Sequence, residues 1–160
     1  MIHVVLYEPE IPQNTGNIMR TCMAFGCRLH LIEPLGFYLD ESHLRRAGMD
    51  YVKELEYEVH SDWDSFLAAH GEGELFFLTR YGHQTPDAFD YAACTRDIYL
   101  VFGKESTGIP LPLLGLPAAF ARGSDQRKGL AGSWLIILTV LWIRGKSAAC
   151  SCGCCAGLAG

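Results

Sequence analysis

The 160-residue sequence lacks the marks of a secreted or membrane protein. No charged stretch followed by an apolar run opens the chain, because polar and acidic residues are already present at positions 7–10. The longest apolar run, residues 134–143, has ten residues, about half of the ~20 that a membrane-spanning helix needs. We therefore expect a cytoplasmic protein of one compact domain, without a membrane partner.

Several catalytic and binding patterns are also missing. The sequence contains neither the phosphate-loop pattern nor the Gly-x-Gly-x-x-Gly dinucleotide pattern, which argues against nucleotide hydrolysis and hydride transfer. It has no Gly-x-Ser-x-Gly elbow, and none of its six histidines is paired at metal-ligand spacing along the chain. We expect no metal and interpret the histidines as structural or exposed.

Cysteine is frequent, but its distribution does not suggest disulfides. Cys22, Cys27 and Cys94 are scattered, whereas the other four cysteines fall within residues 150–155. An odd count of seven with this spacing fits a reducing compartment. We expect Cys22 and Cys27 to pack in the core, and the clustered cysteines lack the usual zinc spacing.

Charge is unevenly distributed along the chain. Residues 1–115 carry 8 Lys and Arg against 17 Asp and Glu, whereas residues 116–160 carry 5 against 1, for a net charge of −5. Such a chain has no overall attraction for nucleic acid, so any RNA contact must use a local patch. Arg45 and Arg46 form one compact basic spot that could contact RNA phosphate, or could simply face water.

Strand and helix signals alternate over the first two thirds of the chain. This alternation predicts an α/β fold, with a mostly parallel sheet and helices on both faces. Gly26 is the expected stop of the first helix, which starts after residues 14–17. Expected strands are 2–7, 28–32, 56–60, 75–79 and 98–102, and expected helices are 18–25, 41–47 and 65–69.

Ligands of open α/β sheets usually bind beyond the carboxyl ends of the strands. The loop after the first strand leads to Asn14, Asn17 and Arg20, near a helix N-terminus that could hold an anion. Arg20 could bind a phosphate or carboxylate with two parallel hydrogen bonds. In the alternative interpretation, Asn14 or Asn17 merely caps the helix and Arg20 is a surface residue.

The loop after the last expected strand, residues 103–110, contains two glycines and one acid. A purely structural turn explains it equally well. Together with the first loop, however, it carries a resemblance to a known family: residues 6–22 (LYEPEIPQNTGNIMRTC) and 100–110 (LVFGKESTGIP) resemble motifs one and two of the SPOUT methyltransferases. Residues 28–37 (RLHLIEPLGF) and 44–51 (LRRAGMDY) resemble the small bacterial subfamily that methylates the wobble nucleotide of tRNA-Leu.

The resemblance implies a homodimer with an α/β trefoil-knot fold. It implies 2′-O-ribose methylation of a cytidine or carboxymethylaminomethyluridine at tRNA position 34, with S-adenosylmethionine as cofactor. Arg20 and Asn14 would be catalytic, facing the ribose and its phosphate. Further site residues implied by position are Leu78, Gly103, Glu105 and Gly108 for the cofactor, and Asn17, Arg45 and Arg46 for tRNA.

The resemblance ends near residue 114. The family's third motif, an Arg-Ile-Pro-Met strand with a Ser-Leu-Asn turn and a closing helix, is not found in residues 120–150. We interpret residues 1–115 as the SPOUT methyltransferase core and residues 116–160 as a divergent C-terminal segment in place of the knot-closing motif. A shifted reading frame and genuine divergence both explain it. The alternative function is a non-catalytic, degenerate SPOUT-like RNA-binding protein.

Overall fold

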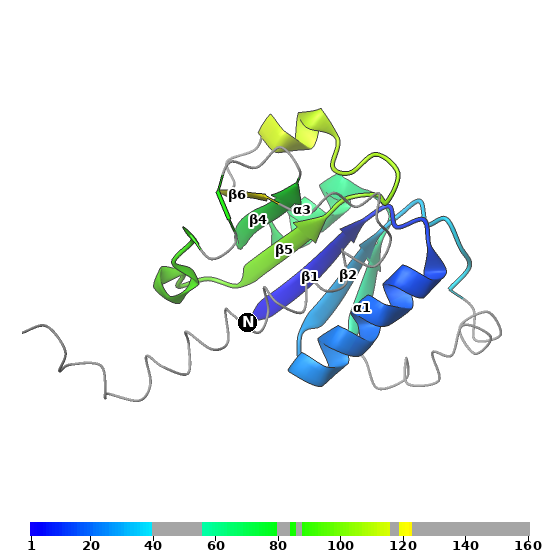
Figure 1. The fold of residues 1–160 in the computed structure, drawn as a ribbon, viewed down its shortest axis with the longest axis horizontal. Coiled ribbons are helices and arrows are strands. Elements are labelled where there is room, and N and C mark those ends of the chain that lie inside the picture. The colour runs from blue at the N-terminus through cyan, green and yellow to red at the C-terminus, as the bar shows by residue number, and fades with distance from the viewer. Residues whose placement is uncertain (40–55, 80–83, 86–87, 116–118, 123–160) are drawn as a thin grey trace, which may run out of the picture.

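The computed structural model describes residues 1–39, 56–79, 84–85, 88–115 and 119–122. These residues form a six-stranded sheet in the order β3-β2-β1-β5-β4-β6, in which every ladder is parallel (Figure 1). The predicted parallel α/β fold is thereby confirmed. The strands are β1 (Ile2–Tyr7), β2 (Arg28–Ile32), β3 (Tyr57–His60), β4 (Glu74–Thr79), β5 (Ile98–Phe102) and β6 (Ala119–Arg122).

The central strand β5 shows why a continuous apolar run in the sequence predicted a buried strand. All five of its residues are buried, since it lies between β1 and β4 and is covered on both faces. In the edge strand β3, by contrast, only His60 is buried, and Glu58 and Val59 are exposed. Strand β6, which pairs with the outer side of β4, was not predicted from the sequence.

Helix α1 (Pro12–Phe25) begins earlier than the sequence suggested. Proline occupies its first turn, where the missing N–H costs no hydrogen bond, and the N-cap residue Ile11 makes no side-chain cap. Asn14 and Asn17 therefore lie inside the helix, and the interpretation of either as its cap is wrong. Gly26 ends the helix as predicted, in the left-handed conformation at φ 55°.

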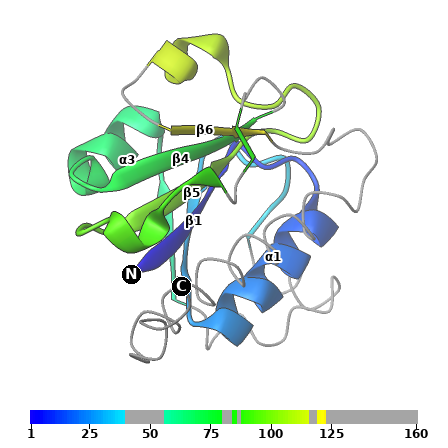
Figure 2. The same ribbon diagram turned by 60° about the vertical axis from the view of Figure 1, so that its left-hand side comes forward.

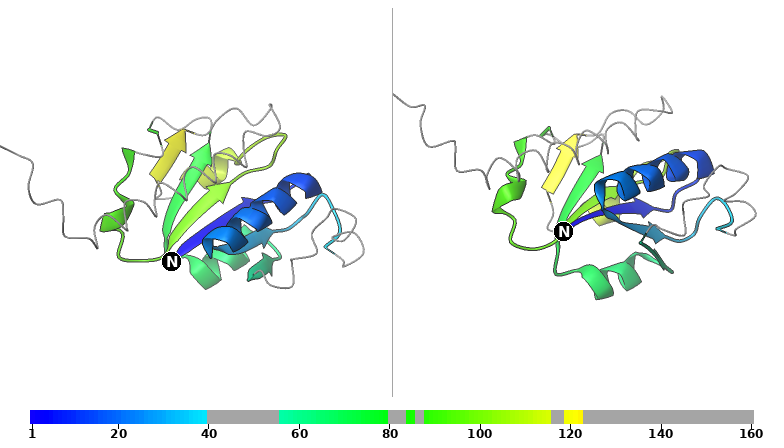
Figure 3. Two further views of the ribbon diagram at one scale, coloured as in Figure 1. Left: turned by 60° about the horizontal axis from the view of Figure 1, so that its bottom comes forward. Right: turned by 90° about the horizontal axis from the view of Figure 1, so that it is seen from below.

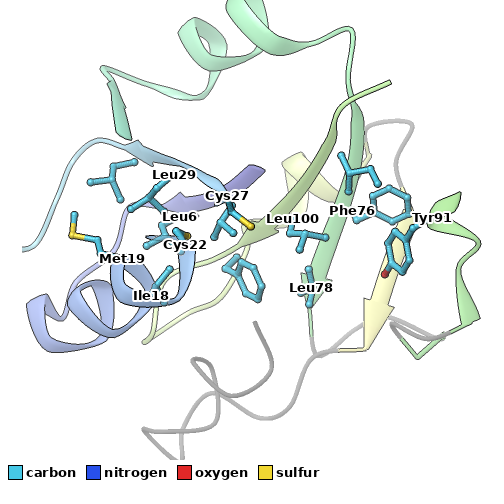
Figure 4. Packing of buried hydrophobic residues seen from close by; sticks show 14 residues of the cluster. Leu6, Ile18, Met19, Cys22, Cys27, Leu29, Phe76, Leu78, Tyr91 and Leu100 are labelled. Atoms are coloured by element: carbon cyan, nitrogen blue, oxygen red, sulfur yellow. The ribbon is translucent and has the colours of Figure 1, made fainter. Parts of the chain in front are cut away.

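Two hydrophobic clusters fill the two faces of the sheet. Helix α1 covers one face, and α3 (Trp63–His70) covers the opposite face (Figure 3). The cluster beneath α1 includes Met19, Leu29 and Leu100, together with the buried Cys22 and Cys27 (Figure 4). The core position expected for both cysteines is confirmed. The cluster beneath α3 is built around Phe66, Phe77 and Val101.

The strand order places a switch point beside β1. The chain passes from β1 through β2 to β3 on one side, and then returns to form β4 and β5 on the other side. In open α/β sheets, ligands bind at such a point, beyond the carboxyl ends of the strands. The loops after β1 and β5 are the two that carry the sequence motifs.

Some sequence predictions fall outside the described residues. These include the helix expected at 41–47, the basic pair Arg45 and Arg46, and the apolar run 134–143. Among the helices that the structure does describe, none combines the length and apolarity needed to cross a bilayer.

The packing yields a matched stability test on two leucines. Leu100 is fully buried in β5, whereas Leu111, in the 3₁₀ helix η4 (Leu111–Gly115), is 71% exposed. We expect Leu100→Ala to lower the free energy of unfolding by about 2–5 kcal/mol, since it leaves a cavity in the core. Leu111→Ala should change it by about 0.5 kcal/mol or less. Urea denaturation of both variants measures the difference, and equal losses would contradict this core.

Candidate active site at the carboxyl ends of β1 and β5

Two loops meet where β1 and β5 end. Leu6 and Phe102 are register partners in adjacent parallel strands, so the segments that follow them, residues 8–11 and 103–110, leave the sheet side by side (Figure 2). We call these segments the first loop and the second loop. They are far apart in sequence, yet the sheet places them in contact.

Glu105 of the second loop binds the first loop through both carboxylate oxygens. Its Oε2 accepts a hydrogen bond from the Glu10 backbone N–H at 2.8 Å. Its Oε1 accepts from the Ile11 N–H at 3.3 Å and from the Asn14 side-chain amide at 3.4 Å. An anion does therefore sit at the start of α1, as expected, but here it is the protein's own carboxylate.

Glu10 returns the contact in the opposite direction. Its carboxylate accepts hydrogen bonds from the Ser106 backbone N–H at 2.9 Å and from the Ser106 hydroxyl at 2.8 Å. Each loop thus supplies a carboxylate that accepts backbone N–H groups of the other loop. Hydrogen bonds to charged acceptors are roughly twice as strong as neutral ones, so the exchange fixes the relative position of the loops.

A third contact joins the two loops close to where they leave β1 and β5. Lys104 forms an ion pair with Glu8, whose carboxylate also interacts with Tyr7. Burial alone would raise the pKa of Glu8, but the hydrogen bonds from Lys104 and Tyr7 outweigh it and lower that pKa. At Tyr7, burial and the hydrogen bond to Glu8 raise the pKa of the side chain to about 12. Glu8 has a positive φ of 47°, a conformation that proteins retain mainly at functional sites.

Two glycines shape the second loop. Lys104 and Gly108 exchange backbone hydrogen bonds of 3.2 and 2.9 Å, which closes the loop into a tight turn. A Cβ at Gly103 would lie 2.2 Å from the Gly108 carbonyl carbon, so only glycine fits there. Gly108 itself has φ +77°, and no atom of the described residues lies within 4 Å of a Cβ built on it. A ligand could therefore approach the Gly108 backbone from the side on which a Cβ would stand.

The predicted site residues divide into three groups. Asn14, Glu105, Gly103 and Gly108 lie together at the contact of the two loops. Asn17 and the exposed Arg20 follow Asn14 along α1 at three-residue steps, so Arg20 lies about 9 Å further along the helix axis. Leu78 lies apart from both groups, in the α1-side core at 2% exposure (Figure 4). The remaining two residues, Arg45 and Arg46, lie outside the described residues.

Sequence reasoning missed Glu10, Lys104 and Ser106. Glu10 is separated from its partner Ser106 by 96 positions, so no local pattern links them. A usable signal was present, since Glu10 and Glu105 each follow a predicted strand, and the loops at the carboxyl ends of parallel strands lie at one edge of a sheet.

Comparison with known proteins identifies the family. Residues 1–119 match the SpoU rRNA Methylase family. The chain belongs to the SpoU methylase family. The tRNA (cytidine(34)-2′-O)-methyltransferase of Escherichia coli K12 is 47% identical over 119 residues, 74% of each chain. Both site loops fall inside the family match, and the predicted membership of the SPOUT methyltransferases is confirmed.

Solved structures share the fold. A structure from work on the 2-OH methylation of C/U34 on tRNA has a TM-score of 0.69 and 34% identity, over 88% of this chain and 96% of that one. An AdoMet-bound rRNA methyltransferase from Sinorhizobium meliloti has a TM-score of 0.74 at 21% identity, over 91% of this chain and 56% of its own. The second likeness shows the fold alone.

The Lys104–Glu8 pair makes stability depend on pH in a defined direction. Because the pKa of Glu8 is lowered from its ordinary 4.5 in the folded protein, its charge stabilises the fold above that value. The contribution disappears as the pH falls through the folded-state pKa. We expect Lys104→Met to lower the free energy of unfolding at pH 7, and the gap from the wild type to close below pH 4.5.

Denaturant titrations at several pH values measure this gap. The matched control is Arg28→Met, which removes the exposed pair between Arg28 and Glu56. Exposed pairs contribute little to stability, so this variant should stay near the wild type at every pH. A gap for Lys104→Met that persists unchanged at pH 3 would show that the ion pair does not cause it.

Proposed function

We propose that this chain is a tRNA 2′-O-ribose methyltransferase that acts on the wobble nucleotide of tRNA-Leu, cytidine or carboxymethylaminomethyluridine 34. One observation carries the proposal: the chain is 47% identical over 119 residues to the Escherichia coli enzyme, and both site loops lie within the family match at residues 1–119. The solved structure from work on C/U34 methylation supports the same substrate. The proposal includes tRNA as partner and S-adenosylmethionine as methyl donor.

The second loop has features that suit a nucleoside-containing cofactor. Gly103 permits the tight turn, and the open side of Gly108 allows a ligand to approach the backbone closely. These two glycines are the residues that would hold the donor, which supplies an already activated methyl group. Leu78 fits this role less well, because it is enclosed in the core beneath α1.

Helix α1 would position the ribose. Methyl transfer requires the 2′-oxygen to lie in line with the methyl carbon, while the hydroxyl proton is lost to solvent. Arg20 is exposed on α1, and an arginine keeps its proton at any ordinary pH, so its role is to bind phosphate rather than to act as a base. Asn14 would orient the ribose from the adjacent turn.

Glu105 would act as a positioning residue. Both of its carboxylate oxygens accept hydrogen bonds from the first loop or from Asn14. A direct bond to the cofactor would compete with these contacts, so Glu105 supports the site by fixing Asn14 and the two loops. In this proposal Glu105 is therefore a positioning residue and not a direct cofactor ligand.

The proposal also includes a homodimer, in which Asn14 and Arg20 face the ribose across the subunit interface. Light scattering of the purified chain tests this part. A mass of two chains supports the arrangement, and a monomer with full activity would contradict it.

Methyl transfer to unmodified tRNA-Leu tests the function directly. We expect label from S-adenosylmethionine in the tRNA, and resistance to alkaline cleavage at nucleotide 34, since a 2′-O-methyl group blocks attack on the adjacent phosphate. Arg20→Lys should reduce kcat/KM about tenfold or more, because lysine cannot bind phosphate with two parallel hydrogen bonds.

Arg96→Lys is the matched control for Arg20→Lys. Arg96 binds Glu74 and the Glu72 carbonyl before β5 begins, at the opposite end of the strands from the site. Its substitution should leave kcat/KM unchanged. Binding of tRNA without any methyl transfer by the wild type would refute the enzyme and favour the degenerate RNA-binding protein. Full activity of Arg20→Lys would refute only the phosphate role.

A further inference from the structure

Four histidines gather on the face of the sheet that α3 covers. His3, His30 and His60 come from the neighbouring strands β1, β2 and β3, and His70 comes from the last turn of α3. Their rings are in contact, with centroids 5.1 Å apart for His3 and His30 and 5.3 Å apart for His30 and His60. Spacing along the chain gave no hint of this cluster, because the parallel sheet assembles it.

Four ligand atoms of this cluster enclose a small space. They are His30 Nδ1, His60 Nε2, His70 Nε2 and Glu58 Oε2, and all lie within 4.8 Å of one another. His30 and His60 are separated by 3.1 Å, as are His70 and Glu58, and Glu58 lies 3.9 Å from both His30 and His60.

Four of these separations, at 3.1 and 3.9 Å, bracket the ligand spacing of a tetrahedral metal site. Ligands that bind zinc at about 2.0–2.1 Å are about 3.3–3.4 Å apart along the edges of the tetrahedron. We propose that His30, His60, His70 and Glu58 bind one divalent transition-metal ion of the zinc class. Four protein ligands leave no open position, so the ion would be structural and would fasten α3 to the β2–β3 edge of the sheet.

The outer contacts of the cluster orient its ligands as metal sites require. His30 Nε2 lies 2.8 Å from His3 Nδ1, and His3 Nε2 in turn faces Asp97 at 3.6 Å. On the other side, His70 Nδ1 lies 3.2 Å from the Tyr99 hydroxyl. Metal-bound histidines commonly donate their second N–H to a carboxylate, a carbonyl or water, which fixes the ring and the tautomer, and here the imidazole of His3 and the hydroxyl of Tyr99 occupy those positions.

The nature of the ligands and their burial define the ion. Three imidazole nitrogens and one carboxylate suit zinc, cobalt or nickel, whereas calcium and magnesium prefer oxygen ligands. His30 is fully buried and His60 nearly so, so their ring nitrogens are shielded from solvent. Glu58 is 47% exposed and provides the path of entry from solvent.

Cobalt binding to the full chain, after removal of metal by a chelator, tests the site. We expect one Co²⁺ per chain with the intense visible absorption of tetrahedral coordination, displaced by Zn²⁺. Because the clustered cysteines could also bind cobalt, the measurement is repeated after their replacement by serine. The cobalt spectrum should persist without thiolate charge-transfer absorption in the variant with serine at Cys150, Cys152, Cys154 and Cys155.

Glu58 lies in β3 and Glu56 directly precedes this strand, so the two glutamates provide a matched comparison. Glu58→Gln removes a proposed ligand at an exposed position, and Glu56→Gln removes the partner of Arg28 instead. We expect Co²⁺ affinity to fall at least tenfold in the first variant and to stay unchanged in the second. Tyr99→Phe, which alters an outer contact, should weaken binding by about 10- to 100-fold.

Circular dichroism of the metal-free variants separates loss of a ligand from loss of the fold. The proposal is overturned if the variant with the four clustered cysteines replaced by serine binds no Co²⁺, or if Glu58→Gln and Glu56→Gln bind it equally well. Either result would mean that the histidines form a hydrogen-bonded network only. Neither result depends on methyl transfer, so the test is independent of the proposed function.

Discussion

The pairing of β1 with β5 is the constraint on which the site depends. The chain makes these strands neighbours although the residues that follow them are more than 90 positions apart, and parallel pairing sends both following loops off the same edge. The Glu105 carboxylate then accepts a hydrogen bond from the Glu10 N–H of the first loop, and the Glu10 carboxylate accepts one from the Ser106 N–H of the second loop. Loop closure over so long a separation has an entropic cost, and the buried β1–β5 ladder contributes to offsetting it.

The two faces of the sheet have different physical roles. The face beneath α1 is almost wholly apolar and holds that helix, with Asn14 and Arg20, in a fixed relation to the strand ends. The face beneath α3 combines an apolar cluster with a layer of histidines that Glu58 and Tyr99 complete. The α1 face therefore supports Asn14 and Arg20, and the α3 face supports the histidine cluster.

Patterns that depend on neighbouring residues were readable from the sequence. The strands β1, β2 and β5 fall at their predicted residues, since their side chains are apolar and their ends are marked by proline or glycine. The start of α1 was misplaced, because Pro12 initiates the helix without a side-chain cap. Partners distant in sequence, such as Glu10 with Ser106 and the histidines of three strands, depend on strand order and could not be read from spacing.

The central claim is that Glu10 and Glu105 join the two loops into one unit. A double-mutant cycle with Glu10→Gln, Glu105→Gln and the combined variant measures this, from free energies of unfolding of the full chain in denaturant. If the loops are joined, the two losses are coupled by about 0.5–3 kcal/mol. Losses that add to within about 0.3 kcal/mol would show independent loops and would contradict the account.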